Sequence, residues 1–210
     1  MIQPPVPTTS GSGVAFSDAS DGDVRGDDSR RAALAHRLGI SDRWATLTQV
    51  HSSKVVEVDR PGDQGEADAM FTSIAGLPLA IFTADCAGVV VHAPGAVGVA
   101  HAGWRGAASR VVEALVDAMR GAGFEPASAA IGPALGPCCL EVGPEVSARF
   151  DGFTARTSWD SESIDLGKAI TVQLDGVEVW AANRCTLHES GWFSHRRDGT
   201  PARMATIAWL

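Results

Sequence analysis

Tyrosine is absent from this chain of 210 residues, and so are long apolar runs and any excess of basic residues. Without tyrosine, no catalytic mechanism of this protein can use a phenol. No run of about 18 apolar residues occurs, which excludes an ordinary transmembrane helix. The first residues also lack the basic start and the apolar stretch of a signal peptide, so we expect a cytoplasmic protein.

The charge balance is acidic, with a formal net charge of −8. Non-specific binding to DNA or RNA needs a basic face, so the sequence predicts no nucleic-acid partner. A nucleotide-sized ligand needs only a few local arginines and is not excluded. The 4 cysteines have no disulfide-like spacing, which is typical of a reducing compartment.

The length predicts one domain over residues 31–210, after a loop-rich N-terminal segment over residues 1–30 that is rich in Pro, Ser, Gly and Asp. Hydrophobic periodicity predicts a mixed α/β fold, in which a mixed β-sheet and flanking helices form a single layered domain. The expected strands are residues 55–58, 79–82, 97–100, 177–180 and 205–209. We expect helices around 29–38, from the turn after His101 to about 121, and around 166–174, with a loop at 59–65.

Three side chains that can coordinate a metal stand near the ends of apolar stretches: His51, Cys86 and His101. Three nitrogen and sulfur ligands with no obvious fourth are what an open, catalytic zinc site uses, because water or substrate takes the fourth position. From residue types alone, two buried histidines and a core cysteine remain the alternative.

Six motifs around these residues resemble those of one family, in the same order, from about Trp44 to the C-terminus. They are His-Ser-Ser-Lys-Val-Val (51–56), Glu-Ala-Asp-Ala-Met (66–70), Thr-Ala-Asp-Cys (83–86), His-Ala-Gly-Trp-Arg-Gly (101–106), Ile-Gly-Pro-Ala-Leu-Gly-Pro-Cys-Cys-Leu-Glu-Val-Gly (131–143) and Phe-Ser-His-Arg-Arg-Asp-Gly (193–199). The family is the laccase-domain or multicopper polyphenol oxidoreductase type, now described as zinc-dependent purine nucleoside phosphorylases. Its fold resembles that of bacterial toxin deamidases.

The resemblance implies an enzyme that binds one Zn²⁺ through His51, Cys86 and His101. It implies phosphorolysis of adenosine, inosine and 5′-methylthioadenosine, together with deamination of adenosine. Copper also suits a thiolate ligand, but 6 histidines are few for a multinuclear copper oxidase, so polyphenol oxidation is disfavoured.

Four further residues are predicted to act in catalysis. Arg105 opens the helix after His101, where free backbone N–H groups and a guanidinium favour a phosphate. Arg196 and Arg197 are expected to close over substrate. Asp85 is either a turn residue or an acceptor that orients a ligand histidine.

Other positions receive weaker assignments from the same motifs. Trp104, Trp192 and Phe193 could stack on a purine or belong to the core, and Arg30 stands near the place of an N-terminal family arginine. The adjacent cysteines 138 and 139 are expected to pack and to shape the pocket. Three histidines match no motif and are not expected to be ligands: His36, His92 and His188.

Four departures from the family pattern are visible. Gly88 replaces the proline of Thr-Ala-Asp-Cys-x-Pro, Leu140 stands where tyrosine is common, Trp192 replaces the first residue of Phe-Phe-Ser, and the N-terminal family segment is not recognisable. Two other functions stay open. Cys86 and His101 could be the nucleophile and base of an amide hydrolase or peptidoglycan-precursor editing enzyme, which would not need His51. The other is a non-catalytic module with a vestigial pocket, and the intact ligands and the two arginine motifs count against it.

Overall fold

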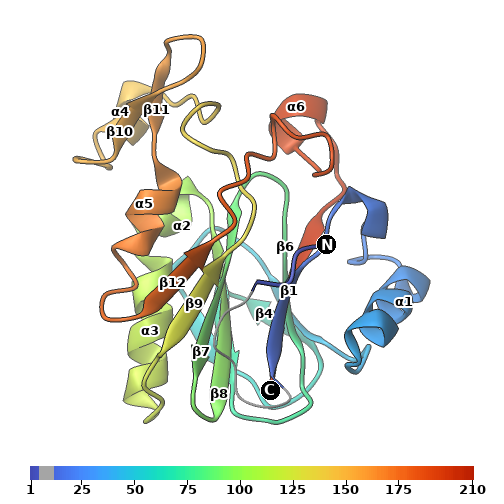
Figure 1. Ribbon diagram of the computed structural model, residues 1–210. Helices are drawn as coiled ribbons and strands as arrows, with labels where there is room; N and C mark the ends of the chain where they lie inside the picture. The colour runs from blue at the N-terminus through green and yellow to red at the C-terminus, as the bar shows by residue number, and fades with distance from the viewer. Residues whose placement is uncertain (5–11) are drawn as a thin grey trace.

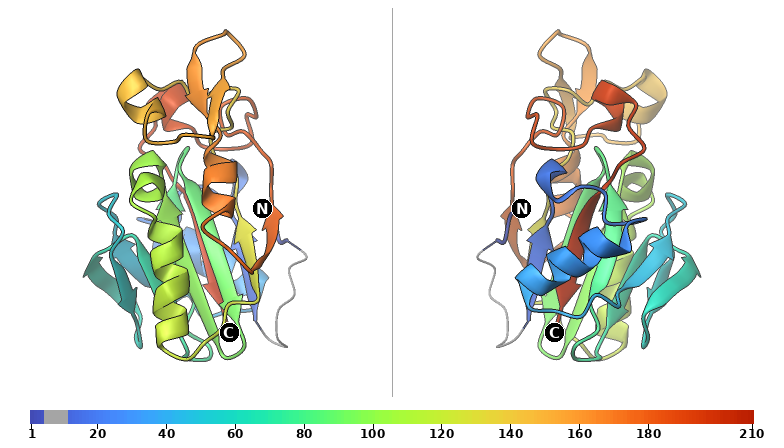
Figure 2. Two further views of the ribbon diagram at one scale, coloured as in Figure 1. Left: turned by 90° about the vertical axis from the view of Figure 1, so that its left-hand side faces the viewer. Right: turned by 90° about the vertical axis from the view of Figure 1, so that its right-hand side faces the viewer.

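The computed structural model describes residues 1–4 and 12–210. Two β-sheets pack face to face, and helices cover the outer face of each, which gives four layers (Figures 1 and 2). The predicted mixed α/β fold is confirmed, although the strands divide between two large sheets where one was expected. No helix of the described residues is both long and apolar enough to cross a membrane.

The larger sheet has six strands, and its two central strands are buried along their whole length. Its order is β12 (Glu178–Ala181), β9 (Ser128–Ile131), β7 (Ala87–Ala93), β8 (Ala96–Ala102), β5 (Ala69–Thr72) and β3 (Val55–Glu57). Burial on both faces explains why β7 and β8 are nearly continuous apolar runs in the sequence. The predicted strands in this sheet are confirmed to within two residues at each end.

The second sheet has five strands, three of which lie where no strand was expected. Its order is β1 (Gly13–Phe16), β13 (Met204–Trp209), β6 (Leu79–Thr83), β2 (Ala45–Thr48) and β4 (Gly62–Glu66). β4 is an exposed polar strand at the sheet edge, so it lacks the hydrophobic alternation that would predict it. β1 lies inside the predicted loop-rich segment and pairs with β13. Residues 5–11 of that segment lie outside the described residues.

Helices cover both outer faces of the sheets. α1 (Asp28–Leu38) is a helix that the sequence predicts, and Gly39 ends it in the left-handed conformation. It packs on the five-stranded sheet. The six-stranded sheet is covered by α2 (Trp104–Ala108), α3 (Val111–Gly121) and α5 (Leu166–Thr171) (Figure 1).

Two helices differ from their predictions. The helix expected after His101 is divided into α2 and α3, because Arg110 between them has a φ of 58°. α5 stops at Thr171, three residues before Leu174. The remaining elements are short: η1 (Ala19–Asp21), α4 (Pro144–Ser147), β10 (Thr154–Arg156), β11 (Glu162–Ile164) and α6 (His195–Asp198).

Candidate metal centre and cavity

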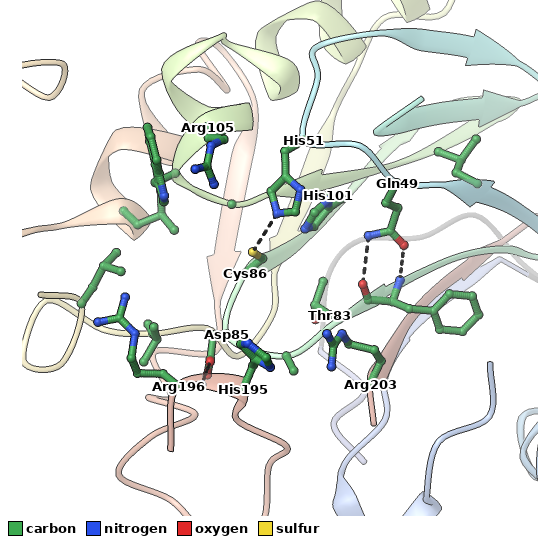
Figure 3. A pocket seen from close by; sticks show the side chains of 18 of the residues that line it. Gln49, His51, Thr83, Asp85, Cys86, His101, Arg105, His195, Arg196 and Arg203 are labelled. Carbon is green, nitrogen blue, oxygen red and sulfur yellow. Dashed lines mark hydrogen bonds between the residues drawn. The ribbon is translucent and has the colours of Figure 1, made fainter. Parts of the chain in front are cut away.

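The three predicted ligands converge although they come from three separate segments. His51 follows β2, Cys86 lies in the turn between β6 and β7, and His101 is in β8. The ligand atoms of all three lie within 4.8 Å of one another, with 3.9 Å between His51 Nε2 and Cys86 Sγ (Figure 3). Ligands of a tetrahedral zinc lie about 3.3–3.8 Å apart, so a small contraction would bring this group to metal-binding distances.

Asp68, the residue just before β5, holds His51 and His101 through hydrogen bonds to its carboxylate. Its carboxylate accepts hydrogen bonds from the backbone N–H groups of Val50 (3.2 Å), His51 (3.0 Å) and Ser52 (2.6 Å). It also lies 2.8 Å from Nδ1 of His101. Holding a proton on Nδ1 leaves Nε2 of His101 free to coordinate, which is the usual role of a carboxylate behind a metal-binding histidine.

Ionisation of the cluster follows from these contacts. Burial by itself would raise the pKa of Cys86, but hydrogen bonds and charges from His101 and His51 lower that pKa to about 6. Burial by itself would lower the pKa of His101, and the bonds to Asp68 and Cys86 instead raise it to about 9. The pKa of Asp68 is lowered because hydrogen bonds from His101 and Ser52 outweigh its burial. The cluster therefore presents a thiolate, the form of cysteine that binds metals.

The backbone around the cluster is specialised. His51 and Asp85 have φ angles of 60° and 88°, which are uncommon for residues other than glycine and concentrate at functional sites. Gly103 has no room for a side chain, because a Cβ atom there would lie 2.7 Å from Cys86 Sγ and 3.2 Å from Cδ2 of His51. The glycine of the His-Ala-Gly-Trp motif is therefore needed to let two ligands meet.

Of the two roles considered for Asp85, orienting a ligand histidine falls to Asp68, whose carboxylate lies 2.8 Å from Nδ1 of His101. The Asp85 carboxylate instead accepts hydrogen bonds from Oγ1 of Thr186 (2.7 Å) and from the backbone N–H of Arg196 (2.7 Å). Asp85 thus joins the turn that carries Cys86 to two distant parts of the chain. The sequence offered a signal for Asp68, since this residue stands at the centre of the Glu-Ala-Asp-Ala-Met motif.

A cavity of about 630 Å³ opens beside the three ligands. Four arginines and one carboxylate, that of Asp85, are among its lining residues, so the cavity is positive although the chain as a whole is acidic. The arginines are Arg25, Arg105, Arg196 and Arg203. Figure 3 shows Arg105 beside His51, and Arg196 and Arg203 on the opposite side of the Cys86 thiol.

Arg105 is exposed, and its guanidinium stacks on the Trp104 ring at 4.4 Å from the ring centroid. Among the described residues it forms no ion pair, so its charge is available to a ligand. The helix that it opens has only five residues, which weakens the predicted contribution of the helix dipole.

The two adjacent arginines of α6 differ. Arg196 lines the cavity, whereas Arg197 donates to the backbone carbonyls of Thr186 (2.9 Å) and Trp192 (2.9 Å) and pairs with Asp198. Arg197 therefore holds α6 in place, and the predicted substrate-closing role does not fit it.

Several other predicted positions lie elsewhere. Arg30 pairs with Asp27 on α1, and the N-terminal arginine that reaches the cavity is Arg25. Of the three candidate purine-stacking residues, Trp104 lines the cavity, and neither Trp192 nor Phe193 does.

Gln49 and His195 also line the cavity and were missed by sequence reasoning. Gln49 is fixed by two hydrogen bonds to the backbone of Phe82, at 2.9 and 2.8 Å. Its place in the Thr-Gln-Val-His stretch before His51 was the available signal.

The sequence of this chain is similar to known proteins over almost its whole length. Residues 13–210 match the family described as "Multi-copper polyphenol oxidoreductase laccase". A purine nucleoside phosphorylase of Streptomyces griseus, ORF3, is 36% identical, with 95% of this chain and 89% of the relative covered. A purine nucleoside phosphorylase of Deinococcus radiodurans is also 36% identical, over 94% of this chain and 82% of the relative.

Solved structures share the whole fold. The crystal structure of YlmD from Geobacillus stearothermophilus matches with a TM-score of 0.86 and 28% identity, over 97% of this chain and 93% of that one. A hypothetical protein YfiH from Bacillus licheniformis matches with a TM-score of 0.87 and 26% identity, over 95% and 92% of the two chains.

Proposed function

This chain belongs to the multi-copper polyphenol oxidoreductase laccase family, and from that premise we propose that it is a zinc-dependent purine nucleoside phosphorylase that also deaminates adenosine. The observation that carries the proposal is the juxtaposition of the His51–Cys86–His101 cluster with a positive cavity. Its volume of about 630 Å³ lies within the range of small-molecule sites and leaves room for a nucleoside and a phosphate together.

Phosphorolysis breaks the bond between C1′ of the ribose and the purine nitrogen, and it forms a bond between C1′ and a phosphate oxygen. The phosphate must approach a sugar carbon that becomes positive as the base leaves. Arg105 is the best candidate to hold this anion, because it is unpaired within the described chain and lies next to the cluster. Arg196 and Arg203 supply positive charge from the opposite side of the cavity. Inosine, adenosine and 5′-methylthioadenosine are the proposed substrates.

His51, Cys86 and His101 would hold the metal, with Asp68 fixing the tautomer of His101. One thiolate and two imidazoles fit Zn²⁺ and leave one position open; copper is the second metal that this set accepts. A zinc ion bound there would polarise an oxygen atom of a reactant.

The decisive assay incubates zinc-loaded protein with inosine and phosphate. We expect hypoxanthine and ribose 1-phosphate, and no hypoxanthine when phosphate is left out. Failure to release hypoxanthine under these conditions would contradict the proposal. Cys86→Ala should remove this activity and adenosine deamination together, because both depend on the same metal.

The variant Arg105→Ala separates the two reactions. Loss of a charge-assisted contact to phosphate costs about 1.5–3 kcal/mol, so inosine phosphorolysis should fall about 10- to 150-fold. Adenosine deamination uses no phosphate and should fall much less. Arg60→Ala is the matched control, since Arg60 is exposed and pairs with Asp59 on the surface. Equal losses in both reactions would assign Arg105 to the metal centre or the fold.

One observation favours a second candidate, an amide hydrolase. Cys86 could serve as nucleophile, His101 as base and Asp68 as the carboxylate that orients the base. The pKa of the Cys86 thiol is lowered to about 6, which favours the nucleophilic thiolate. His51 distinguishes the candidates, because a Cys–His–Asp triad does not need it. Protein that keeps no metal but hydrolyses amide substrates, and whose His51→Ala variant stays active, would support this alternative.

A further inference from the structure

A second group of sulfur and nitrogen side chains lies apart from the three-ligand cluster. Cys138, Cys139, Cys185 and His188 each offer one ligand atom, and these four atoms all lie within 4.8 Å of one another. The three cysteines are free thiols. The sequence predicts only that Cys138 and Cys139 pack and shape the pocket, the proposed reaction uses none of the four residues, and sequence reasoning set His188 aside.

Sheet topology brings these four residues together. β9 and β12 are adjacent parallel strands, so the segments that leave their carboxyl ends emerge at the same edge of the sheet. Ala134 and Cys185 continue the pairing as an isolated parallel bridge, with hydrogen bonds from Ala134 N to Arg184 O (3.2 Å) and from Thr186 N to Ala134 O (3.1 Å). The turn that carries Cys138 and Cys139 therefore faces the turn that carries Cys185 and His188.

The local geometry suits a tetrahedral metal ion. Cys138 Sγ lies 3.7 Å from Nδ1 of His188, and a sulfur and a nitrogen bound to one zinc lie about 3.5 Å apart. Cys185 Sγ accepts a hydrogen bond from the backbone N–H of Gly136 (3.4 Å), as expected of a thiolate that needs support. Cys185 and His188 are three residues apart in a turn closed by a hydrogen bond from Glu189 N to Cys185 O (3.2 Å), the close spacing common in structural zinc sites.

We propose that Cys138, Cys139, Cys185 and His188 bind a second zinc ion as a closed structural site. Three cysteines and one histidine complete a tetrahedron, so no position remains for water or substrate. Thiolate ligands select zinc over magnesium or calcium. Cys138 and Cys185 also line a cavity of about 320 Å³, which gives an ion a path to them from solvent. This inference stands whether or not the chain is a phosphorylase.

A zinc ion at this site would stabilise the part of the large cavity that α6 forms. Arg197 of α6 donates to the carbonyls of Thr186 (2.9 Å) and Leu187 (3.2 Å), which lie between Cys185 and His188 in the chain. Its neighbour Arg196 lines the large cavity. An ion that fixes the turn of residues 185–188 therefore also fixes α6, and with it Arg196, at the edge of the cavity.

The main competitor is a disulfide between Cys185 and Cys138 or Cys139, which an oxidant would form with loss of two protons and two electrons. The two possibilities predict different contents of metal and of free thiols. A zinc site holds three thiolates and no disulfide, whereas a disulfide leaves too few ligands for zinc.

The test measures metal content in the full chain, expressed with zinc in the medium and purified without chelator. Wild-type protein should hold about two zinc ions per chain, and Cys86→Ala should hold about one, in the second site. The Cys86→Ala protein then receives Co²⁺ in place of zinc, and we expect the strong sulfur-to-cobalt absorption of several thiolates. A folded Cys86→Ala protein that binds no metal would overturn the proposal. So would a disulfide found by non-reducing peptide mapping of protein purified without reductant.

Variants of the second group sharpen the assignment. Cys185→Ser and His188→Ala should each lose about one zinc ion per chain and keep the ion at the first cluster. His36→Ala is the matched control, because His36 is an exposed histidine of α1, and it should keep both ions. If a variant of the second group fails to fold, the Cys86→Ala measurement still decides, since it leaves all four proposed ligands intact. Full zinc content in folded Cys185→Ser would contradict the site.

Discussion

The two Cys/His groups of this protein are built in different ways. The first cluster, His51, Cys86 and His101, stands at strand ends and is held by the buried carboxylate of Asp68. The second group, Cys138, Cys139, Cys185 and His188, lies in two turns. Within the described chain, Cys185 Sγ accepts a hydrogen bond from the backbone N–H of Gly136, and Cys138 contacts His188 of the same group.

This difference indicates how much each group depends on a metal. Asp68 receives hydrogen bonds from three consecutive backbone N–H groups, so the first cluster keeps its shape through protein contacts alone. Three ligands and an adjoining cavity suit chemistry on a bound reactant. The second group has four ligands, and residues 1–4 and 12–210 provide no buried carboxylate that supports them as Asp68 supports His101, so we expect the ion itself to order the turns.

The largest effect that separates the two groups is expected from Gly103→Ala. The new Cβ atom would lie 2.7 Å from Cys86 Sγ, so the first cluster cannot close on a metal. Metal content should drop by about one ion per chain, and nucleoside cleavage should fall below detection. Gly191→Ala is the control, since nothing lies within 4 Å of its added Cβ. Normal activity in Gly103→Ala would refute this picture of the cluster.

Asp68→Asn tests the scaffold of the first cluster without removing a ligand. Loss of such a supporting partner typically costs about 10- to 100-fold in metal affinity, and the second group should be unaffected. Competition with a chelator, followed by metal analysis, measures both affinities in one preparation. Asp59→Asn serves as the control, because Asp59 is an exposed carboxylate. An unchanged affinity at the first cluster would mean that Asp68 supports only the fold.

A smaller effect is expected for the hydrogen bond that connects the two Cys/His groups. Asp85 precedes Cys86, Thr186 follows Cys185, and the bond from Thr186 Oγ1 to Asp85 links them at 2.7 Å. Thr186→Val removes a buried bond to a carboxylate and should lower the free energy of unfolding by about 1.5–3 kcal/mol. Thr186→Ser keeps the hydroxyl and should lower it less. Chemical denaturation measures the difference, and equal losses in both variants would argue against the bond.

The smallest effect concerns the reactivity of the cysteines in metal-stripped protein. The pKa of Cys86 is lowered to about 6, whereas the pKa values of Cys138 and Cys139 are raised, chiefly by burial. Thiolate forms as pH rises through the pKa, so alkylation of Cys86 should reach half its maximal rate near pH 6. At neutral pH the advantage of Cys86 should be modest, because a thiolate of low pKa is a weaker nucleophile.

Mass spectrometry of alkylated peptides over a pH series tests this order. His101→Ala should move the midpoint of Cys86 upward, since His101 supplies the largest of the effects that lower its pKa. A wild-type midpoint near 9, the ordinary value for a cysteine, would show that the imidazoles do not stabilise the thiolate.

Parts of the fold followed from local pattern, and parts did not. The apolar runs of β6 and β8 and the capped helix α1 were predicted, because burial and capping leave direct traces in the chain. The edge strand β4 was not, because its stability comes from a neighbour and its residues are polar. The break at Arg110, where φ is 58°, was not either, since arginine itself favours a helix.

The sequence by itself determined the family, the mixed α/β class and the three candidate ligands, because six ordered motifs carry that information. Only the tertiary structure decided that Asp68 supports His101, that Arg196 faces the cavity while Arg197 does not, and that His188 meets three cysteines. Each of these outcomes depends on contacts between segments far apart in the chain. Residue types and spacing indicate which side chains can coordinate a metal or bind an anion, and the packing of the sheets determines which of these side chains lie together.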